Sequence, residues 1–308
     1  MSDLLVAKNL TKQYGSKIAL NDFDLTIPKG SVYGLLGPNG AGKTTFLRII
    51  NQITAPDKGT VMIDGKPLDK SVIPMVGYMP EERGLYNNMK IGEQALYFAK
   101  LKGLSSAEAK KKTEYWFEKL GISEWWDKKL TELSKGMGQK VQFVITVLHD
   151  PELLIFDEPF SGFDPVNAQI IANEILELRD KGTTIIFSTH RMESVEEMCD
   201  HIALINLSNK VLDGPIHEVK NKFKSGKYFV EIENPEVNSW DRFVNNFDVE
   251  TLGNNGYTTQ FKISKPENTG SNQLLQEISQ LGHIVQYREA IPSINEIFLQ
   301  SVKNDSNF

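Results

Sequence analysis

The sequence predicts an α/β protein in which a mostly parallel sheet carries an inserted helical subdomain and is followed by a small α+β domain. Up to about residue 218, short apolar runs alternate with helical patterns, which is typical of a parallel sheet covered by helices. Residues 91–149 show helical spacing without a convincing strand. Beyond residue 228 the order βαββαβ, followed by one more helix, indicates a ferredoxin-like sandwich.

In the first domain, β-branched and apolar runs define the expected strands, which are Leu4–Lys8, Ala19–Leu25, Ser31–Leu36, Gly59–Ile63, Val76–Met79, Leu153–Phe156, Thr184–Ser188 and Ile202–Asn206. Helices are expected at Gly42–Asn51, Val166–Arg179 and Met192–Met198. The inserted subdomain, at about 88–150, is expected to hold helices at Ile91–Lys102, Ala107–Leu120 and Gly138–His149.

Two domains are expected, covering residues 1–220 and 228–308. The basic stretch between them, which contains Gly and Ser, is interpreted as a linker. In the second domain the expected strands are 228–233, 247–252, 256–263 and 284–289, and the expected helices are 237–246, 271–281 and 293–302.

Composition narrows the class of protein. The chain has 308 residues, of which 40% are hydrophobic and 24% charged, as in an ordinary globular protein. Its single cysteine, Cys199, allows no internal disulfide, so a reducing, cytosolic setting is expected. No stretch approaches the ~20 apolar residues of a membrane span, so any role at a membrane is expected to come through a partner.

Charge argues against a nucleic-acid partner. The net charge of −6 falls entirely within residues 228–308, while residues 1–227 hold 29 basic and 29 acidic side chains. Nucleic-acid-binding domains usually carry a basic excess, which neither domain shows.

A phosphate-binding loop is expected directly after the apolar run Val32–Leu36. The segment matches the pattern G-x-x-x-x-G-K-[ST] and consists of Gly37, Pro38, Asn39, Gly40, Ala41, Gly42, Lys43, Thr44 and Thr45. Its glycines let backbone N–H groups point at phosphate oxygens, and the helix that follows adds its positive N-terminal dipole. Lys43 supplies a cation, and the Thr44 hydroxyl is suited to Mg²⁺. The alternative is a glycine-rich turn with a surface lysine.

Two carboxylates end the apolar run Leu153–Phe156. Asp157 is suited to hold Mg²⁺, and Glu158 to polarise the attacking water as a general base. Adjacent residues on an extended chain point to opposite faces, so different roles are expected. A solvated strand end is the alternative, but together with the phosphate loop the pair indicates a P-loop nucleotidase.

The segment Leu133-Ser134-Lys135-Gly136-Met137 narrows this class, because it resembles the signature loop of the ATP-binding cassette (ABC) family, which usually reads LSGGQ. In that family the loop binds the γ-phosphate of ATP held by the other subunit. The resemblance therefore implies that Ser134 and Gly136 contact a nucleotide across a dimer. A plain helix cap at Ser134 is compatible with this role.

Three further segments are similar to motifs of the same family. Tyr14-Gly15 is similar to the loop that stacks on adenine, although Tyr14 could equally be a turn residue. Ser161-Gly162-Phe163-Asp164 resembles the loop that links the two sites of the dimer, and Asp164-Pro165 also fits a helix start. His190 resembles the histidine that contacts the γ-phosphate, while a structural role is the alternative.

The chain departs from the family pattern at three positions. Glu81 stands where most cassettes have a glutamine that touches Mg²⁺ and water, so an oxygen acceptor is kept but the amide donor is lost. Met137 replaces the glutamine of the signature, and Lys135 replaces a glycine. Lys135 either faces the nucleotide of the other subunit or points to solvent, and we favour solvent.

The resemblance implies an ATP hydrolase that drives a separate membrane permease. ATP and Mg²⁺ are the expected cofactors, with Thr44, Asp157 and Glu81 around the metal and Glu158, His190 and Glu81 serving hydrolysis. A homodimer, or a heterodimer with a second cassette, is expected on the inner, cytoplasmic face of a bacterial cell membrane. Pro80–Tyr86 and Pro292–Phe298 further resemble the ABC-2-type exporter branch, associated with sodium, multidrug or antibiotic export.

Two alternatives to a transporter subunit remain open from the sequence. A soluble cassette ATPase of translation usually holds two cassettes in one chain, and repair members insert a long coiled coil, whereas this chain has one phosphate loop and one signature. A regulatory ATPase whose C-terminal domain senses a ligand is the other alternative. Intact Lys43, Asp157 and Glu158 argue against an inactive site, so ligand sensing remains an added role for residues 228–308.

Overall fold

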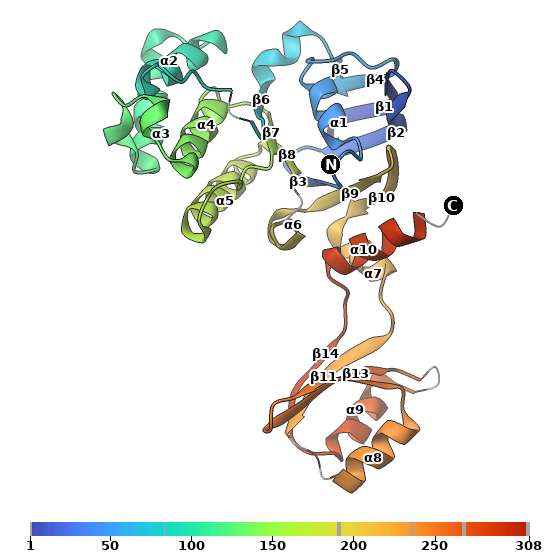
Figure 1. Ribbon diagram of the computed structural model, residues 1–308. Coiled ribbons are helices and arrows are strands. Elements are labelled where there is room, and N and C mark those ends of the chain that lie inside the picture. Colours follow the sequence, from blue (N-terminus) through green and yellow to red (C-terminus); the bar gives the residue numbers. More distant parts are fainter. Residues whose placement is uncertain are drawn as a thin grey trace. The chain divides into compact units, whose positions relative to one another are not determined.

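The computed structural model describes residues 2–82, 84–189, 192–233, 235, 237–266 and 269–305. Within these ranges the chain forms two compact units (Figure 1). The first unit comprises residues 2–216 together with 300–305, and the second comprises residues 217–299. The second unit thus begins a few residues before the linker that the sequence indicated, and the end of the last helix groups with the first unit.

The first unit contains two sheets. A four-stranded antiparallel sheet has the order β2-β1-β4-β5, with β1 at Asp3–Tyr14, β2 at Lys17–Pro28, β4 at Lys58–Ile63 and β5 at Lys66–Pro67. A six-stranded sheet has the order β10-β9-β3-β8-β7-β6, with β10 at Asn209–Pro215, β9 at His201–Asn206, β3 at Val32–Leu36, β8 at Thr184–Ser188, β7 at Leu153–Asp157 and β6 at Val76–Met79. Neighbours in the second sheet are parallel except β9 and β10, which pair antiparallel.

All eight expected strands are present, but three of them form the separate antiparallel sheet instead of joining the parallel one. The turn at Gly15-Ser16 is the physical reason, because a two-residue connection joins only antiparallel strands and so forces β1 and β2 into a hairpin. The two sheets share one hydrophobic core with α1 (Lys43–Ile50), in which the Phe46 ring lies 5.2 Å from that of Phe23.

The inserted subdomain consists of three helices that gather apart from the sheets in Figure 1. They are α2 (Ile91–Leu101), α3 (Ser106–Lys119) and α4 (Lys135–Val147). Two short 3₁₀ turns, η2 (Ser123–Trp125) and η3 (Leu130–Glu132), connect α3 to α4. A capping box starts α3, since Glu108 N donates to Ser105 Oγ and Ser105 N to Glu108 Oε2.

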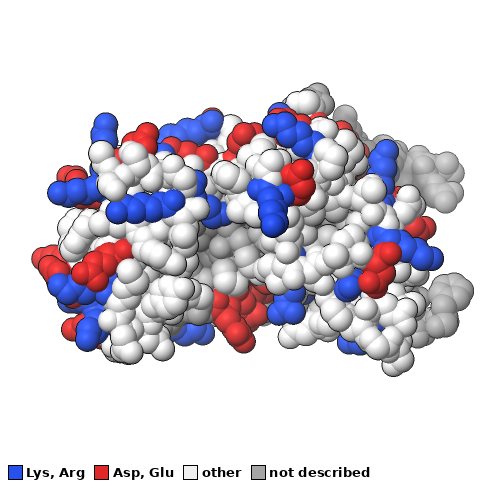
Figure 2. Space-filling model, turned by 90° about the horizontal axis from the view of Figure 1, so that it is seen from above, with Lys and Arg blue, Asp and Glu red and all other residues white. Residues whose placement is uncertain are grey.

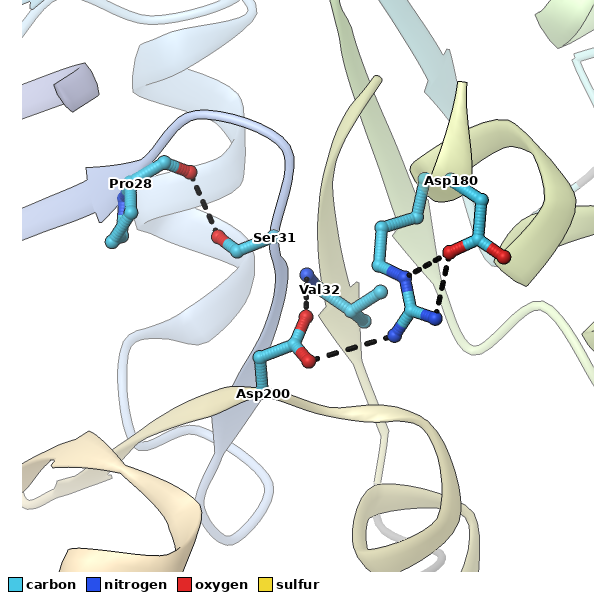
Figure 3. A network of polar contacts seen from close by, with 6 residues as sticks. Pro28, Ser31, Val32, Asp180 and Asp200 are labelled. Atoms are coloured by element: carbon cyan, nitrogen blue, oxygen red, sulfur yellow. Dashed lines mark hydrogen bonds and ion pairs between the residues drawn. The ribbon is translucent and has the colours of Figure 1, made fainter. Parts of the chain in front are cut away.

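The amino end of β3 is fixed by a polar network (Figure 3). Val32 N donates to Asp200 Oδ2 at 2.8 Å, and Ser31 Oγ donates to Pro28 O at 2.7 Å. Arg179, near the end of α5 (Pro165–Asp180), forms an ion pair with Asp200 and donates two hydrogen bonds to Asp180. The strand that leads into the phosphate loop is therefore held at its start, opposite the loop.

The first unit is completed by η1 (Lys70–Met75) and α6 (Met192–Met198). Cys199 follows α6, is buried, and has its Sγ 3.0 Å from the position that a Cβ on Gly34 would take. Burial raises the pKa of the Cys199 thiol, which keeps it protonated. Cys199 is therefore a packing residue.

The second unit contains a four-stranded antiparallel sheet of order β12-β13-β11-β14, with β11 at Lys227–Glu233, β12 at Val249–Asn254, β13 at Thr258–Ser264 and β14 at Ile284–Glu289. Helices α8 (Val237–Asn246) and α9 (Ser271–Ser279) cover one face of this sheet in Figure 1. Helix α7 (Ile216–Lys222) precedes the sheet, and α10 (Ile294–Asp305) follows it. The order is that of the expected βαββαβ sandwich, and alternate residues such as Val230, Ile232, Phe261 and Ile263 form its own core.

No helix in the described ranges has the length and apolar character needed to span a bilayer. On the face shown in Figure 2, Lys and Arg side chains are interspersed with Asp and Glu side chains and do not form one basic field. This view agrees with the charge balance of the sequence.

Candidate nucleotide site

The phosphate loop leaves the carboxyl end of β3, where two of its glycines have φ angles that favour glycine. Gly37 has a φ of 147° and Gly42 a φ of 122°. A Cβ on Gly37 would lie 2.2 Å from Ile205 O, and a Cβ on Gly42 would lie 2.4 Å from Ala19 O. The loop therefore requires glycine at both positions, because neighbouring backbone leaves no room for a side chain.

The first turn of α1 is arranged to bind an anion. Gly42 occupies its N-cap without a side-chain hydrogen bond, and the first turn holds no acidic residue. The backbone N–H groups of the first turn have no side-chain partner, and together with the positive end of the helix dipole they face the place where phosphate would lie. Lys43 is 8% exposed, and its Nζ donates to Gly37 O at 2.6 Å and to Pro38 O at 3.2 Å. Burial lowers the pKa of Lys43, while the nearby Glu158, Asp157 and Glu81 act in the opposite direction.

A cavity of about 210 Å³ lies over this loop and includes the tyrosine singled out in the sequence. Its lining consists of Tyr14, Lys17, Ala19, Asn39, Gly40, Gly42, Lys43, Thr44 and Thr45. Tyr14 ends β1, is 47% exposed, and has the Lys12 ammonium 5.4 Å from its ring centroid. Tyr14 is thus brought beside the loop from the neighbouring hairpin, as a base-stacking residue requires.

Lys17 is a residue of this cavity that sequence reasoning missed. It begins β2, opposite Tyr14 across the hairpin, and its Nζ is 3.8 Å from the position that a Cβ on Gly40 would take. Its distance from the phosphate-loop motif in the sequence hid it, and only its position directly after the hairpin turn that follows Tyr14 could have indicated it.

Asp157, which ends β7, and Glu158, which follows it, lie beside the phosphate loop because β8 alone separates β7 from β3. Asp157 is 5% exposed, and burial raises its pKa, with the charges of Glu81 and Glu158 acting in the same direction. Lys43 is the cation that opposes this shift. The site therefore gathers three carboxylates around one buried lysine, an excess of negative charge that suits a divalent cation.

Glu158 is held in a strained backbone conformation. Its φ is 52°, in the left-handed region that residues other than glycine seldom adopt, and its N–H donates to Ser188 O at 2.9 Å. The expectation that Asp157 and Glu158 alternate along an extended chain is therefore wrong, because the strand ends at Asp157 and the chain turns at Glu158. Thr189, the residue after β8, donates from its Oγ1 to Glu158 Oε2 at 3.2 Å, a positioning contact that sequence reasoning also missed.

The oxygen atoms at this site suit Mg²⁺, which takes phosphate and water ligands, better than a metal ion that is held by protein side chains alone. In the described part of the chain, no group of three or more His, Cys, Asp or Glu side chains is close enough to hold an ion alone. Mg²⁺ commonly takes one or two carboxylates, nucleotide phosphates and several waters, so Thr44, Asp157 and Glu81 offer a suitable donor set.

Helix α4 begins at Lys135, three residues earlier than the sequence indicated, so Lys135–Met137 of the signature segment lie in its first turn. Ser134 is the N-cap, and its Oγ accepts a hydrogen bond of 3.2 Å from Met137 N. This cap explains the earlier start, since Ser134 satisfies an N–H that would otherwise lack a partner. A cavity of about 410 Å³ lies here, lined by Trp125, Ser134, Lys135, Gly136, Met137, Lys140, Gly162, Asp164 and Asn167.

Lys135 is exposed but does not simply point to solvent. Its Nζ donates to Ser161 Oγ at 3.3 Å, and its side-chain carbons lie 2.7–2.9 Å from the position that a Cβ on Gly162 would take. Asp164 caps α5 by accepting from Val166 N and Asn167 N, with Pro165 in the first turn, as its sequence indicated. The signature and the Ser161–Asp164 segment therefore form one surface.

The structure brings Tyr14, the phosphate loop, Asp157, Glu158 and Glu81 to one region, and Ser134 and Gly136 to another. The two cavities share no lining residue. His190 lies outside the described residues. A phosphate loop in one place and the signature segment in another are the arrangement that the resemblance to the ATP-binding cassette family implies.

Comparisons with known proteins agree with this class. The family model for the ABC transporter matches residues 20–161, and that for the C-terminal domain of DrrA1-3-like ATP-binding proteins matches residues 214–302. An uncharacterized ABC transporter ATP-binding protein of Bacillus subtilis, YhaQ, is 37% identical over 97% of this chain and 98% of its own length. A Nod factor export ATP-binding protein of Cupriavidus metallidurans is 34% identical, covering 71% of this chain and 73% of its own.

Among solved structures, an ATP-binding subunit of an ABC transporter aligns with a TM-score of 0.67 and 30% identity, covering 71% of this chain and 93% of that one. The chain belongs to the ATP-binding subunits of ABC transporters, which bind and hydrolyse ATP. This membership confirms the transporter interpretation over the translation, repair and purely regulatory alternatives.

Proposed function

We propose that this chain is the ATPase of an exporter and that it drives a separate membrane permease by ATP-dependent closure of a cassette dimer. The direction is supported by the similarity to a Nod factor export ATP-binding protein. The chain would act at the inner face of the cell membrane, where it has access both to cytosolic ATP and to its permease.

Each nucleotide would be bound by two chains. In one chain, Tyr14 stacks on adenine, the loop Gly37–Thr45 surrounds the phosphates, and Lys43 leaves its two carbonyl partners for the phosphate oxygens. In the second chain, the N–H groups after Ser134 face the γ-phosphate. Glu158 accepts the proton of the attacking water, and Thr189 orients its carboxylate. His190 is proposed to contact the γ-phosphate.

Mg²⁺ would be held by Thr44, Asp157 and Glu81, and when bound it neutralises phosphate charge. Its positive charge would also favour the ionised form of Asp157, whose pKa is otherwise raised by burial. Loss of the γ-phosphate removes the contacts to the opposite Ser134 loop, so the dimer reopens.

The permease would dock on an apolar cavity of about 440 Å³ between α2, α4 and β6. Several large apolar side chains around it are exposed, among them Ile73, Tyr86, Tyr97 and Leu101. Gln142 connects this cavity to the site, because its Nε2 donates to Pro80 O at 2.9 Å, next to Glu81. Docking and nucleotide binding are thereby coupled through a single short segment.

The observation that carries the dimer proposal is the separation of the two cavities within one chain. Its test uses the full chain carrying Glu158→Gln, which should keep ATP bound and form a dimer in sedimentation velocity. Adding Ser134→Asp keeps a helix-capping side chain but places a negative charge against the γ-phosphate of the other chain. The dimer should then be lost, while affinity for a fluorescent ATP analogue stays within about twofold, a difference of about 0.4 kcal/mol.

Ser105→Asp is the matched control, since Ser105 caps α3 in the same way but lines neither cavity. It should leave ATP-induced dimerisation intact. If Ser134→Asp instead weakened ATP binding to the isolated chain, the signature would act on its own nucleotide and the proposal of a shared site would be wrong.

A further inference from the structure

The apolar cavity between α2 and α4 contains an unusual stripe of polar groups. Helix α4 and the residues after it contribute Gln142, Thr146 and His149, and the spacings of four and seven residues from Gln142 place them on one face. The rest of the lining is mostly apolar and includes Tyr78, Leu85, Phe98 and Leu101. Polar atoms in such surroundings are costly unless each has a hydrogen-bond partner.

Gln142 has one acceptor without a partner. The residue is 3% exposed, and its Nε2 donates to Pro80 O at 2.9 Å. Because a carbonyl oxygen only accepts, this bond fixes the orientation of the amide. Its Oε1 is closed off from solvent and has no hydrogen-bond partner in the described part of the chain.

His149 presents a second acceptor of the same kind. Its Nε2 lies 3.2 Å from Val76 O, so Nε2 carries the proton and Nδ1 is a bare lone pair. Nδ1 is also shielded from solvent and unpartnered among the described residues. Burial lowers the pKa of His149 to about 4, with the nearby Lys102 acting in the same direction, so the ring is neutral near pH 7.

Lys102 determines which donors fit. Its Nζ donates to Val76 O at 2.7 Å and to Ile73 O at 3.0 Å, and the residue lines the same cavity as Gln142 and His149. A second cation entering this apolar space would face the Lys102 charge at low dielectric, which is unfavourable. The missing partners are therefore neutral donors such as hydroxyl or amide groups.

We propose that the permease segment that docks here is a helix whose apolar face carries two neutral hydrogen-bond donors, which pair with Gln142 and His149. This inference rests on the proposed docking of a permease in the cavity. Gln142 and His149 are seven positions apart in the chain, about 10 Å along a helical path, so a helix lying along α4 places its donors about seven positions apart. Docking relieves the cost of both acceptors, since the entering helix displaces the side chains that now cover them.

The test uses the full chain and three fluorescent 14-residue helical peptides that are apolar on one face. They carry Thr, Val or Lys at positions 4 and 11, and Thr and Val differ only by a hydroxyl in place of a methyl group. The Thr peptide should bind about tenfold more tightly than the Val peptide by fluorescence anisotropy, and the Lys peptide should bind least. This comparison needs no substitution in the protein.

Gln142→Met and His149→Leu should each reduce the preference for Thr over Val, and together they should abolish it. Thr146→Val is the matched control, because Thr146 lines the same cavity but its hydroxyl already donates to Gln142 O. Equal binding of the Thr and Val peptides would overturn the inference about donors while leaving docking in place. Binding of none of the peptides would overturn the docking place itself.

Discussion

At the scale of single residues, Glu158 combines the expected general base with a strained backbone. A residue with a side chain at a φ of 52° is disfavoured by about 1 kcal/mol, and glycine is not. We expect Glu158→Gly to be about 1 kcal/mol more stable to urea unfolding than Glu158→Ala. ATP turnover should fall at least about a hundredfold in both, because each lacks the base. Equal stability of the two variants would show that the turn carries no strain.

Lys17 is expected to act on the phosphates of the nucleotide, because its ammonium lies next to Gly40 in the loop cavity. Lys17→Met should lower the affinity for ATP about fivefold to tenfold, as expected for loss of one partly exposed charge-assisted contact. The affinity for adenosine should not change, since it lacks phosphates. Isothermal titration with both ligands measures the difference, and Lys17→Arg should restore ATP binding. An equal loss for adenosine would place Lys17 at the base instead.

The sequence predicted the residues that lie within continuous motifs and missed those that folding brings from elsewhere. The loop from Gly37 to Thr45 follows its strand directly, so its spacing alone indicated phosphate binding. Thr189 and Lys17 belong to no such motif, and their roles follow from contacts with Glu158 and Gly40 across strands. Lys135 was misjudged for the same reason, because Ser161 and Gly162 lie more than twenty residues away in the chain.

At the scale of elements, every expected helix and strand is present, while the grouping of strands into sheets and the start of α4 differ. Short apolar runs predict strands but not their partners, so the antiparallel sheet of β1, β2, β4 and β5 was not separated from the parallel one. Strands β5 and β10 were missed, since Lys66-Pro67 and Asn209–Pro215 show no alternation of buried and exposed residues. In the second unit the connections are short, and the expected order of elements alone led to the observed sandwich.

His149, two residues after the end of α4, should make the free energy of unfolding depend on pH. Folding lowers the pKa of His149 from its ordinary 6.5 to about 4, chiefly through burial, with Lys102 and Lys112 adding to the shift and Asp150 opposing it. Between pH 6.5 and 4 the unfolded chain binds this proton and the folded chain does not. The free energy of unfolding should therefore fall as pH falls, by up to about 1.4 kcal/mol per pH unit from this residue.

His149→Leu should remove this contribution, so that its stability curve falls less steeply than that of the unaltered chain over the same range. Urea unfolding followed by tryptophan fluorescence at several pH values measures both curves. His217→Leu, at an exposed histidine, is the matched control. Parallel curves for the unaltered chain and His149→Leu would mean that His149 is not buried as a neutral ring.

At the scale of the whole molecule, the two units differ in charge and have separate cores. The excess acidic charge belongs to residues 228–308, while the part that binds nucleotide is balanced. The first core surrounds α1 and its two sheets, and the second surrounds Val230, Phe261 and Leu274. Because each core is complete within its unit, each unit is expected to unfold as its own cooperative transition.

Scanning calorimetry of the full chain should therefore show two transitions, of which ADP stabilises only one. ADP at a hundred times its Kd adds about 2.7 kcal/mol to the unit that binds it. Phe261→Ala, at a fully buried position of the second core, should destabilise only the transition that ADP leaves unchanged, by about 3–5 kcal/mol. Phe143→Ala, equally buried in the first unit, should lower only the transition that ADP raises. A single transition moved by ADP and by both substitutions would show that the units unfold together, and nucleotide binding would then be coupled to the C-terminal domain through stability.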